Sequence, residues 1–311
     1  MKRIVLILTA VLMLVCSFSG CSGKDGDSDK LKIVATVFPP YDFAHVIAGD
    51  RAEVSMIIRP GSESHTFEPT PNDMKKAEES DIFIAFGGES ESWAQRLINA
   101  SENKDRLSVT LNDCVALLEA SSGQEHHHHS DEHSHTHEHD EHIWTSPKNA
   151  VKISEAIYKA ICEKDPENKD YYTENYNSLI DKLNKLDASY KEVTLNSNKT
   201  LVFGDRFPFL YLAKEYSLNY RAAFSGCAEQ TQPNVNTLIE LIEFIKEENI
   251  ETVFYTEFSS QKIADTLCSE TGAEKQLLHS CHNVTKSEWE NGETYITLME
   301  KNLNALKIAL K

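Results

Sequence analysis

Four polar side chains stand where this 311-residue sequence could hold a metal ion. His65, Asp205 and Glu257 each follow an apolar run of strand-like composition, and His142 precedes the start of a helical pattern. Open α/β sheets bind ligands at the carboxyl ends of their strands, so these side chains are expected at such an edge. Two imidazoles and two carboxylates suit a divalent transition metal. The residues therefore predict a metal site assembled from both halves of the chain.

Each of the four residues also has a purely structural interpretation. His65 lies among Gly, Ser, Glu and Pro and could be an exposed loop histidine, and His142 could simply end a histidine-rich tract. Asp205 could cap the helix that follows it. Glu257 could interact with a helix dipole in a first turn. Residue type and position alone leave both carboxylates open as ligands.

A second set of metal-binding side chains fills residues 124–144, which hold nine of the thirteen histidines. Closely spaced neutral imidazoles form many alternative weak metal sites, and the neighbouring Asp and Glu raise the local cation concentration. The segment has too few apolar residues to fold by itself, and its internal, mixed composition argues against a purification tag. We expect a mobile collector or sensor of metal ions over residues 124–141, the alternative being a solvated loop with incidental metal binding. Its accessory ligands would be His126, His127, His128, His129, His133, His135, His137 and His139.

Strand-like runs alternate with helical patterns through both halves of the chain. One helix is marked by Thr70 and Pro71, as cap and first residue, and another by an apolar stripe between residues 235 and 245. This alternation predicts an α/β fold with two lobes, each a mainly parallel sheet flanked by helices. The expected strands begin near Lys32, Glu53, Asp81, Thr200, Tyr220 and Glu251.

A long helix is predicted in the middle of the chain. It comes after a helix that starts at Ser146 and Pro147, and no Gly or Pro interrupts residues 167–193. At about 1.5 Å per residue it would be about 40 Å long, too long for an ordinary crossover. Half of a coiled coil is the alternative, but a single run of under four heptads favours one rigid helix joining two lobes. The expected parts are an N-terminal lobe 31–165, a linker helix 166–193 and a C-terminal lobe 194–311.

The first residues carry an export signal. Three residues ending in Arg3 precede a short apolar run at residues 4–15, which is typical of a secretory signal and too short to span a bilayer comfortably. The sequence FSGC, ending at Cys21, resembles the lipobox of bacterial lipoproteins, although Phe18 stands where Leu is usual. We expect a signal peptide over 1–21, a lipid on Cys21 and a flexible tether over 22–30. The alternative is plain cleavage and a soluble secreted product.

Charge and cysteine content narrow the class of protein further. The formal net charge of −18 argues against nucleic acid as a partner, because phosphates require a basic face. Beyond Cys21 the odd number of cysteines, without a CxxC pair, permits a disulfide but does not specify one. Cys227 and Cys281, next to predicted strand ends, are the first candidate pair. The pairing is otherwise open among Cys114, Cys162, Cys227, Cys268 and Cys281.

Four segments resemble the motifs of the cluster A-I solute-binding proteins of metal ABC transporters, a family of zinc- and manganese-binding lipoproteins. They are RPGSESHTFEPTPNDM, HIWTSPKNAV, FGDRFPFLYLAKEYSL and FYTEFSSQKIADTL, in the family's order and spacing, and the resemblance covers residues 32–311. It implies one metal between two α/β lobes joined by a rigid helix, with His65 and His142 as first-lobe ligands. The third position, often His in zinc members and Glu in manganese members, falls on Asp205. The fourth falls on Glu257 or, a few places further on, Gln261.

Two imidazoles with carboxylates do not by themselves distinguish zinc from manganese. In this family a loop rich in His and acidic residues goes with zinc members, so the resemblance implies Zn²⁺ as cargo and Mn²⁺ as the alternative. It further implies a monomer, lipid-anchored to the outer face of the bacterial cytoplasmic membrane. Its partners would be an integral membrane metal ABC permease and the cytoplasmic ATPase of that permease.

Other classes of function have less support in the sequence. A metallohydrolase needs an open coordination position and a general base, but the sequence has no HExxH motif and no nucleophile elbow. We therefore expect no enzymatic activity. A surface adhesin that uses zinc only for stability is the remaining alternative.

Overall fold

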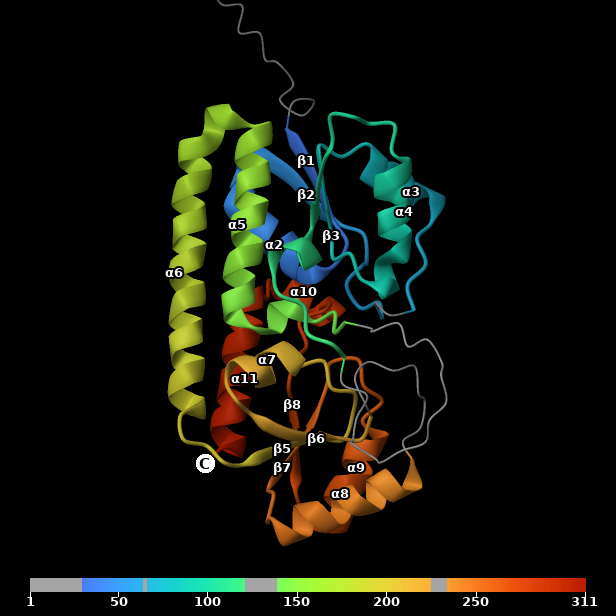
Figure 1. The fold of residues 1–311 in the computed structure, drawn as a ribbon, viewed down its shortest axis with the longest axis vertical. Coiled ribbons are helices and arrows are strands. Elements are labelled where there is room, and N and C mark those ends of the chain that lie inside the picture. The colour runs from blue at the N-terminus through green and yellow to red at the C-terminus, as the bar shows by residue number, and fades with distance from the viewer. Residues whose placement is uncertain (1–29, 64–65, 121–138, 225–233) are drawn as a thin grey trace, which may run out of the picture. The chain divides into compact units, whose positions relative to one another are not determined.

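Two four-stranded parallel sheets form the framework of the computed structural model, which describes residues 30–63, 66–120, 139–224 and 234–311 (Figure 1). The strand orders are β2-β1-β3-β4 and β6-β5-β7-β8, so both sheets share one topology. The predicted two-lobe α/β fold is confirmed. The strands are β1 (Leu31–Ala35), β2 (Ala52–Met56), β3 (Ile82–Ala85), β4 (Leu107–Thr110), β5 (Thr200–Phe203), β6 (Asn219–Ala222), β7 (Thr252–Tyr255) and β8 (Glu274–Leu277).

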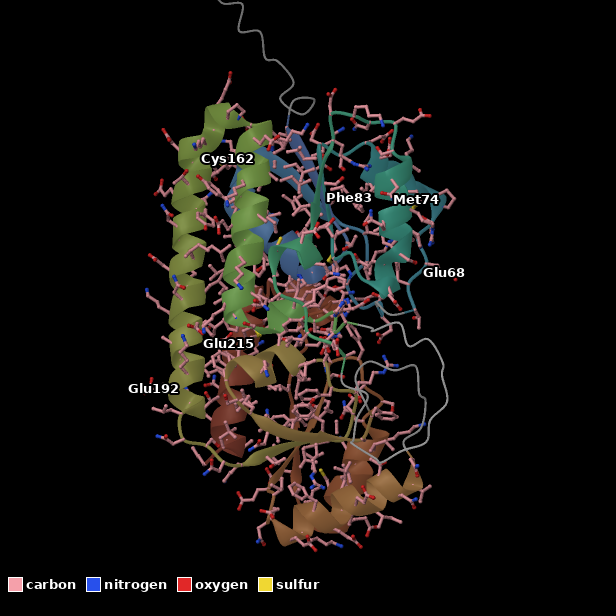
Figure 2. The ribbon with its side chains drawn as sticks, viewed as in Figure 1. Glu68, Met74, Phe83, Cys162, Glu192 and Glu215 are labelled. Carbon is pink, nitrogen blue, oxygen red and sulfur yellow. The ribbon has the colours of Figure 1, made fainter. Side chains whose placement is uncertain are left out.

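Helices cover both faces of the first sheet, and the buried strand β3 shows why. Successive side chains of a strand point to opposite faces. Ile82 and Ile84 therefore join the large core, whereas Phe83 packs in a smaller cluster with residues of α3 and α4. Figure 2 shows Phe83 pointing toward these two helices. The helices of this half are α2 (Phe38–Ala48), α3 (Pro71–Glu78), α4 (Ser92–Ala100) and α5 (Pro147–Lys164).

Local signals explain where several of these helices begin. The Thr70 hydroxyl accepts a hydrogen bond from Asp73 N, the Asp73 carboxylate accepts one from Thr70 N, and Pro71 takes the first helical position of α3. This capping box satisfies amide groups that have no partner within the helix. Ser146 caps α5 in the same position before Pro147. Both helix starts agree with the sequence prediction.

In the second sheet, a close approach of two backbones fixes the loop that carries Asp205. A Cβ on Gly204 would lie 2.6 Å from Ala264 Cα, so only glycine allows the chain leaving β5 to pass this close to α9. The helices of this half are α7 (Leu210–Glu215), α8 (Val235–Glu247), α9 (Lys262–Thr271), α10 (Lys286–Glu290) and α11 (Tyr295–Ala309).

The long helix α6 (Lys169–Thr194) has 26 residues, about 39 Å at about 1.5 Å per residue. It packs against α2, α5 and α11, and the Tyr190 hydroxyl donates to Met299 O at 2.8 Å. Glu192 projects from its outer side (Figure 2). Residues 31–311 form one compact unit, and its largest hydrophobic cluster includes Ile33, Tyr190 and Phe203. The predicted long connecting helix is confirmed, and a single core runs past it from one sheet to the other.

Two expectations about the chain need separate comment. Cys281 is a buried free thiol, so the candidate disulfide with Cys227 is wrong; Cys114, Cys162 and Cys268 are also free. The export signal and Cys21 lie outside the described residues, as does Cys227. Across the ranges that the structure describes, no helix is both long and apolar enough to cross a membrane.

Candidate metal centre

Two buried imidazoles lie together in the interior. His142 is 2% exposed and His282 6%, and their ring centroids are 5.2 Å apart with the ring planes at 85°. Two imidazoles on one tetrahedral zinc ion, at Zn–N distances of about 2.0–2.1 Å, place their centroids about 5 Å apart. One metal ion can therefore bridge this pair. Sequence reasoning predicted His142 and missed His282.

Asp140 orients the first imidazole of the pair. Its Oδ1 accepts a hydrogen bond from His142 N at 2.9 Å and lies 3.3 Å from His142 Nδ1. A carboxylate at Nδ1 fixes the tautomer and ring orientation and leaves Nε2 for a metal. Asp140 was also missed from the sequence, although an Asp two residues before a ligand histidine was a usable signal.

The second imidazole belongs to the segment 279–284, the His282 loop. Groups from the first half of the chain hold this loop: Trp144 Nε1 donates to Ser280 O at 2.9 Å, and Phe38 N donates to His282 O at 3.3 Å. From the other side, the Asn302 carboxamide accepts from His279 N and donates to His279 O, both at 2.7 Å. His282 therefore sits on a loop that is bonded to both halves of the molecule.

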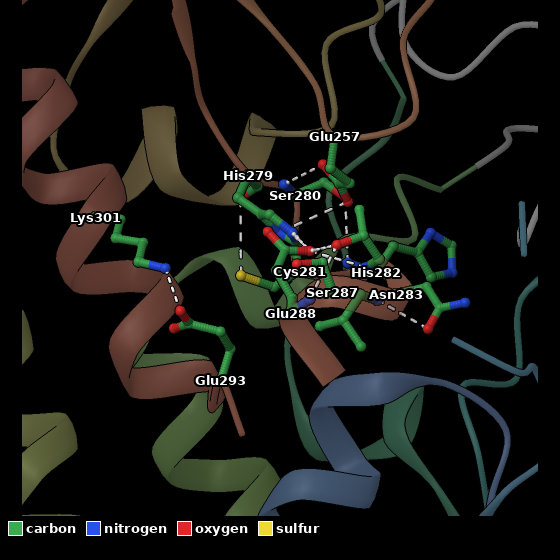
Figure 3. A network of polar contacts seen from close by, with 12 residues as sticks. Glu257, His279, Ser280, Cys281, His282, Asn283, Ser287, Glu288, Glu293 and Lys301 are labelled. Atoms are coloured by element: carbon green, nitrogen blue, oxygen red, sulfur yellow. Dashed lines mark hydrogen bonds and ion pairs between the residues drawn. The ribbon is translucent and has the colours of Figure 1, made fainter. Parts of the chain in front are cut away.

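Glu257 reaches the His282 loop directly (Figure 3). Its carboxylate accepts from Ser280 N at 2.9 Å and from Ser280 Oγ at 2.5 Å, and Ser280 Oγ in turn accepts from His282 N at 3.2 Å. Next to it, His279 Nε2 lies 3.4 Å from a Glu288 oxygen. Burial acts to raise the pKa of Glu288, but its bonds with His279 and Thr285 outweigh burial and lower it to about 2. In this structure Glu257 holds the loop that presents His282, and its role as a ligand stays a prediction.

Asp205 links the ends of two neighbouring strands. Its Oδ2 accepts from Thr256 N at 3.0 Å and Thr256 Oγ1 at 2.7 Å, and its Oδ1 accepts from Arg206 N at 2.8 Å. The alternative fourth ligand Gln261 accepts a hydrogen bond at Oε1 from Lys275 Nζ, 2.8 Å away. The placement of Asp205 and Glu257 just beyond β5 and β7 agrees with the sequence reading. Metal ligation by Asp205 or Gln261 remains a prediction.

Residues that precede the histidine-rich tract are bonded to residues just before His142. His139 forms an isolated antiparallel bridge with Glu119, and Asp140 N donates to Leu118 O at 2.9 Å. The Tyr211 hydroxyl closes the same junction: it accepts from Leu118 N and donates to Asp140 O, each at 3.0 Å. His139 apart, the accessory histidines lie outside the described residues.

His65, the other predicted histidine ligand, also lies outside the described residues, three positions after Ser62. Among the residues that are described, no three His, Cys, Asp or Glu side chains are close enough to hold a metal ion together. A metal between His142 and His282 thus requires at least one further ligand, and the sequence offers His65 for that place.

Comparison with known proteins agrees with this chemistry. The family model ZnuA, described as zinc-uptake complex component A periplasmic, matches residues 33–309. The zinc-binding lipoprotein AdcA of Streptococcus pneumoniae (strain ATCC BAA-255 / R6) is 32% identical over 99% of this chain and 61% of its own length. The high-affinity zinc uptake system protein ZnuA of Bacillus subtilis (strain 168) is 32% identical over 98% of this chain and 96% of its own.

A solved structure shares the fold. The Zn(II)-bound ZnuA-like domain of Streptococcus pneumoniae AdcA has a TM-score of 0.75 and 32% identity, covering 90% of this chain and 99% of that one. The chain spans about 61% of the length of the AdcA lipoproteins that it matches. With a family match from the first strand to the last helix, this chain belongs to the ZnuA family of zinc-uptake components.

Proposed function

We propose that this protein captures Zn²⁺ outside the cytoplasm and delivers it to a metal ABC permease. The observation that carries the proposal is the buried pair of His142 and His282, at a separation that one metal ion bridges. The ligand set is His65, His142 and His282, and the fourth position falls to Asp205, Glu257, Gln261 or water. Family membership supports the role in uptake, and the zinc-binding relatives support the metal.

His282 favours zinc over manganese. Two imidazoles with two carboxylates leave the metal ambiguous, whereas a third imidazole moves the donor set from oxygen toward nitrogen. The carboxylates of Asp205 and Glu257 also accept hydrogen bonds from backbone amides and hydroxyl groups near the site. Manganese remains the alternative cargo.

The task of such a site is capture and release, with no turnover of a substrate. Zinc binds to neutral imidazoles, so its affinity should fall as acidity rises through the histidine range. The lipid on Cys21 would keep the monomer at the outer face of the cytoplasmic membrane, near its permease and the ATPase of that permease. The segment 124–141 would collect zinc for the site.

The test uses the mature chain with the eight accessory histidines replaced by serine, so that only the buried site reports. We expect one zinc ion per chain in competition titration, with manganese displaced. His142→Ala and His282→Ala should each abolish tight binding, while His45→Ala, an exposed histidine on α2, leaves it unchanged. Parental zinc affinity in His282→Ala would remove the ligand set proposed here, and manganese retained against zinc would reverse the cargo.

A further inference from the structure

Asn283 follows His282 and bonds to the segment that leads to His65. Its Nδ2 donates to Arg59 O at 2.8 Å and to Ser62 O at 2.9 Å, and the next residue, Val284, accepts from Gly61 N at 2.7 Å. Resting on the proposed zinc capture, we infer that Asn283 is a positioning residue: it ties the His282 loop to the Arg59–Ser62 turn and so fixes His282 for metal binding.

The segment that Asn283 grips is a tight turn. Ser62 N donates to Arg59 O at 3.1 Å, Pro60 takes the second position and Gly61 the third, with φ +83°. These features match a type II turn, in which glycine supplies the positive φ. A Cβ on Gly61 would lie 3.0 Å from the Lys286 side chain, so the turn also packs closely on α10. The turn is stiff, and it ends three residues before His65.

The hydrogen bonds of the Asn283 side chain require an amide. Two carbonyl oxygens face one end of the Asn283 side chain and Val284 N faces the other, 2.9 Å from Oδ1, so the NH₂ group must point at the turn. Both amide hydrogens are used, and the residue is 1% exposed. An aspartate of the same shape would place a carboxylate against two carbonyls without a proton to share. That arrangement leaves buried acceptors unpaired and is unfavourable.

The His282 loop and the Arg59–Ser62 turn, which precedes His65 in the sequence, are therefore joined at one side chain. The backbone of His282 is fixed by Phe38 N, and its neighbour Asn283 carries that fixed position to the Arg59–Ser62 turn. Groups that orient metal ligands from outside the coordination shell typically change metal affinity by about 10–100-fold when they are removed. The two hydrogen bonds from Asn283 Nδ2 thus tie His282 to a turn more than 200 residues away in the sequence.

The experiment compares Asn283→Asp with Asn175→Asp, both in the chain whose eight accessory histidines are replaced by serine. Asn175 makes the same kind of bond, from Nδ2 to Ile47 O at 3.1 Å, but it lies on α6 among residues unrelated to the site. We expect Asn283→Asp to weaken zinc binding by about 10–100-fold and to change the absorption spectrum of bound Co²⁺, because one ligand is displaced. The Asn175 variant should keep the parental affinity and spectrum, even if both variants melt at lower temperature without metal.

Asn283→Ser removes the amide without adding charge and repeats the test if the aspartate variant does not fold. Tight zinc binding by the parent, lost in His142→Ala, checks the proposed function separately. With that established, zinc affinity and a Co²⁺ spectrum unchanged in a folded Asn283 variant would overturn the positioning role. The same loss of affinity in the Asn175 variant would overturn it as well, because the effect would then be one of general stability.

Discussion

At the scale of single residues, carboxylates hold the segments around the candidate metal site. Asp140 orients His142, Glu257 holds Ser280, and Asp205 joins the residues after β5 and β7. Each accepts a hydrogen bond from a backbone amide, and bonds from such amides to a carboxylate are among the stronger ones in a protein. Asp140 contacts His142 directly and Glu257 reaches His282 through Ser280, so these two carboxylates help to position the buried histidines.

Asp140→Asn should weaken zinc binding by about 10–100-fold, because a neutral amide oxygen at His142 Nδ1 raises the basicity of the imidazole less than a carboxylate does. The fold should persist, since the side-chain oxygen can still accept from His142 N. Competition titration measures the effect, with Asp113→Asn as the matched exposed control. Equal affinities in the two variants would show that Asp140 does not act on the ligand.

Asp42 predicts a pH dependence that is unrelated to metal. Burial raises its pKa to about 7, and the bond from Tyr295 N and the charge of Lys182 only partly oppose this. The folded pKa exceeds the unfolded value of 3.8, so this contribution to stability is complete below about pH 4 and is lost as pH rises through 7. Asp42→Asn keeps the acceptor for Tyr295 N and should stabilise the metal-free protein at pH 8 by about 1–3 kcal/mol. Urea unfolding at pH 5 and pH 8 measures the free energy of unfolding of the variant and the parent. A difference between them that did not grow from pH 5 to pH 8 would contradict the prediction.

At the scale of elements, local sequence signals correctly predicted several strands and helices. Thr70 with Pro71 and Ser146 with Pro147 start helices as expected, and the apolar runs of β3, β5 and β7 are buried strands. Strand β8, of sequence EKQL, escaped because it is short, polar and partly exposed. With β8 unseen, the His282 loop after it had no position in the predicted sheet.

The candidate site was predictable in location but not in detail. Position after a strand placed Asp205 and Glu257 at the carboxyl ends of β5 and β7, where the structure has them, because parallel strands end together. Which atoms their carboxylates bond is decided by Thr256 and by Ser280, and the Ser280 contact has no local signature. The contacts of Asn283 likewise have no local sequence signature, since its partners lie more than 200 residues away in sequence.

The junction of Leu118 and Asp140, which the Tyr211 hydroxyl bridges, gives a prediction at the scale of elements. Tyr211→Phe deletes the hydroxyl that bridges Leu118 N and Asp140 O, which should cost about 0.5–1.5 kcal/mol and loosen the residues before His142. Tyr158→Phe loses a hydroxyl contact to Thr173 on the α5–α6 pair and serves as control. We expect similar melting temperatures but weaker zinc binding only in Tyr211→Phe. Identical zinc affinities in the two variants would show that the junction does not affect zinc binding.

For the whole molecule, the contacts around the site limit how far the two sheets can move apart. The Tyr295 hydroxyl donates to Trp144 O at 2.6 Å, and the Trp144 indole donates to Ser280 O, so residues from both halves are bonded through one buried side chain. The continuous core beside α6 acts in the same direction, because packed interiors resist gradual deformation. A wide hinge would break these bonds and expose apolar surface.

Zinc should therefore bind with small tilts and local ordering rather than with closure of two separate lobes. Small-angle scattering of the chain whose eight accessory histidines are replaced by serine should give the same radius of gyration, within error, with zinc and with chelator. Hydrogen exchange should instead slow locally, in the Arg59–Ser62 turn and the His282 loop, because the metal ties these segments to each other. The turn's amides in Asn283→Asp should lose this protection while those of α8 stay unchanged. A clear compaction on adding zinc, or slower exchange spread evenly through α6 and both sheets, would mean that the core permits a hinge that its contacts argue against.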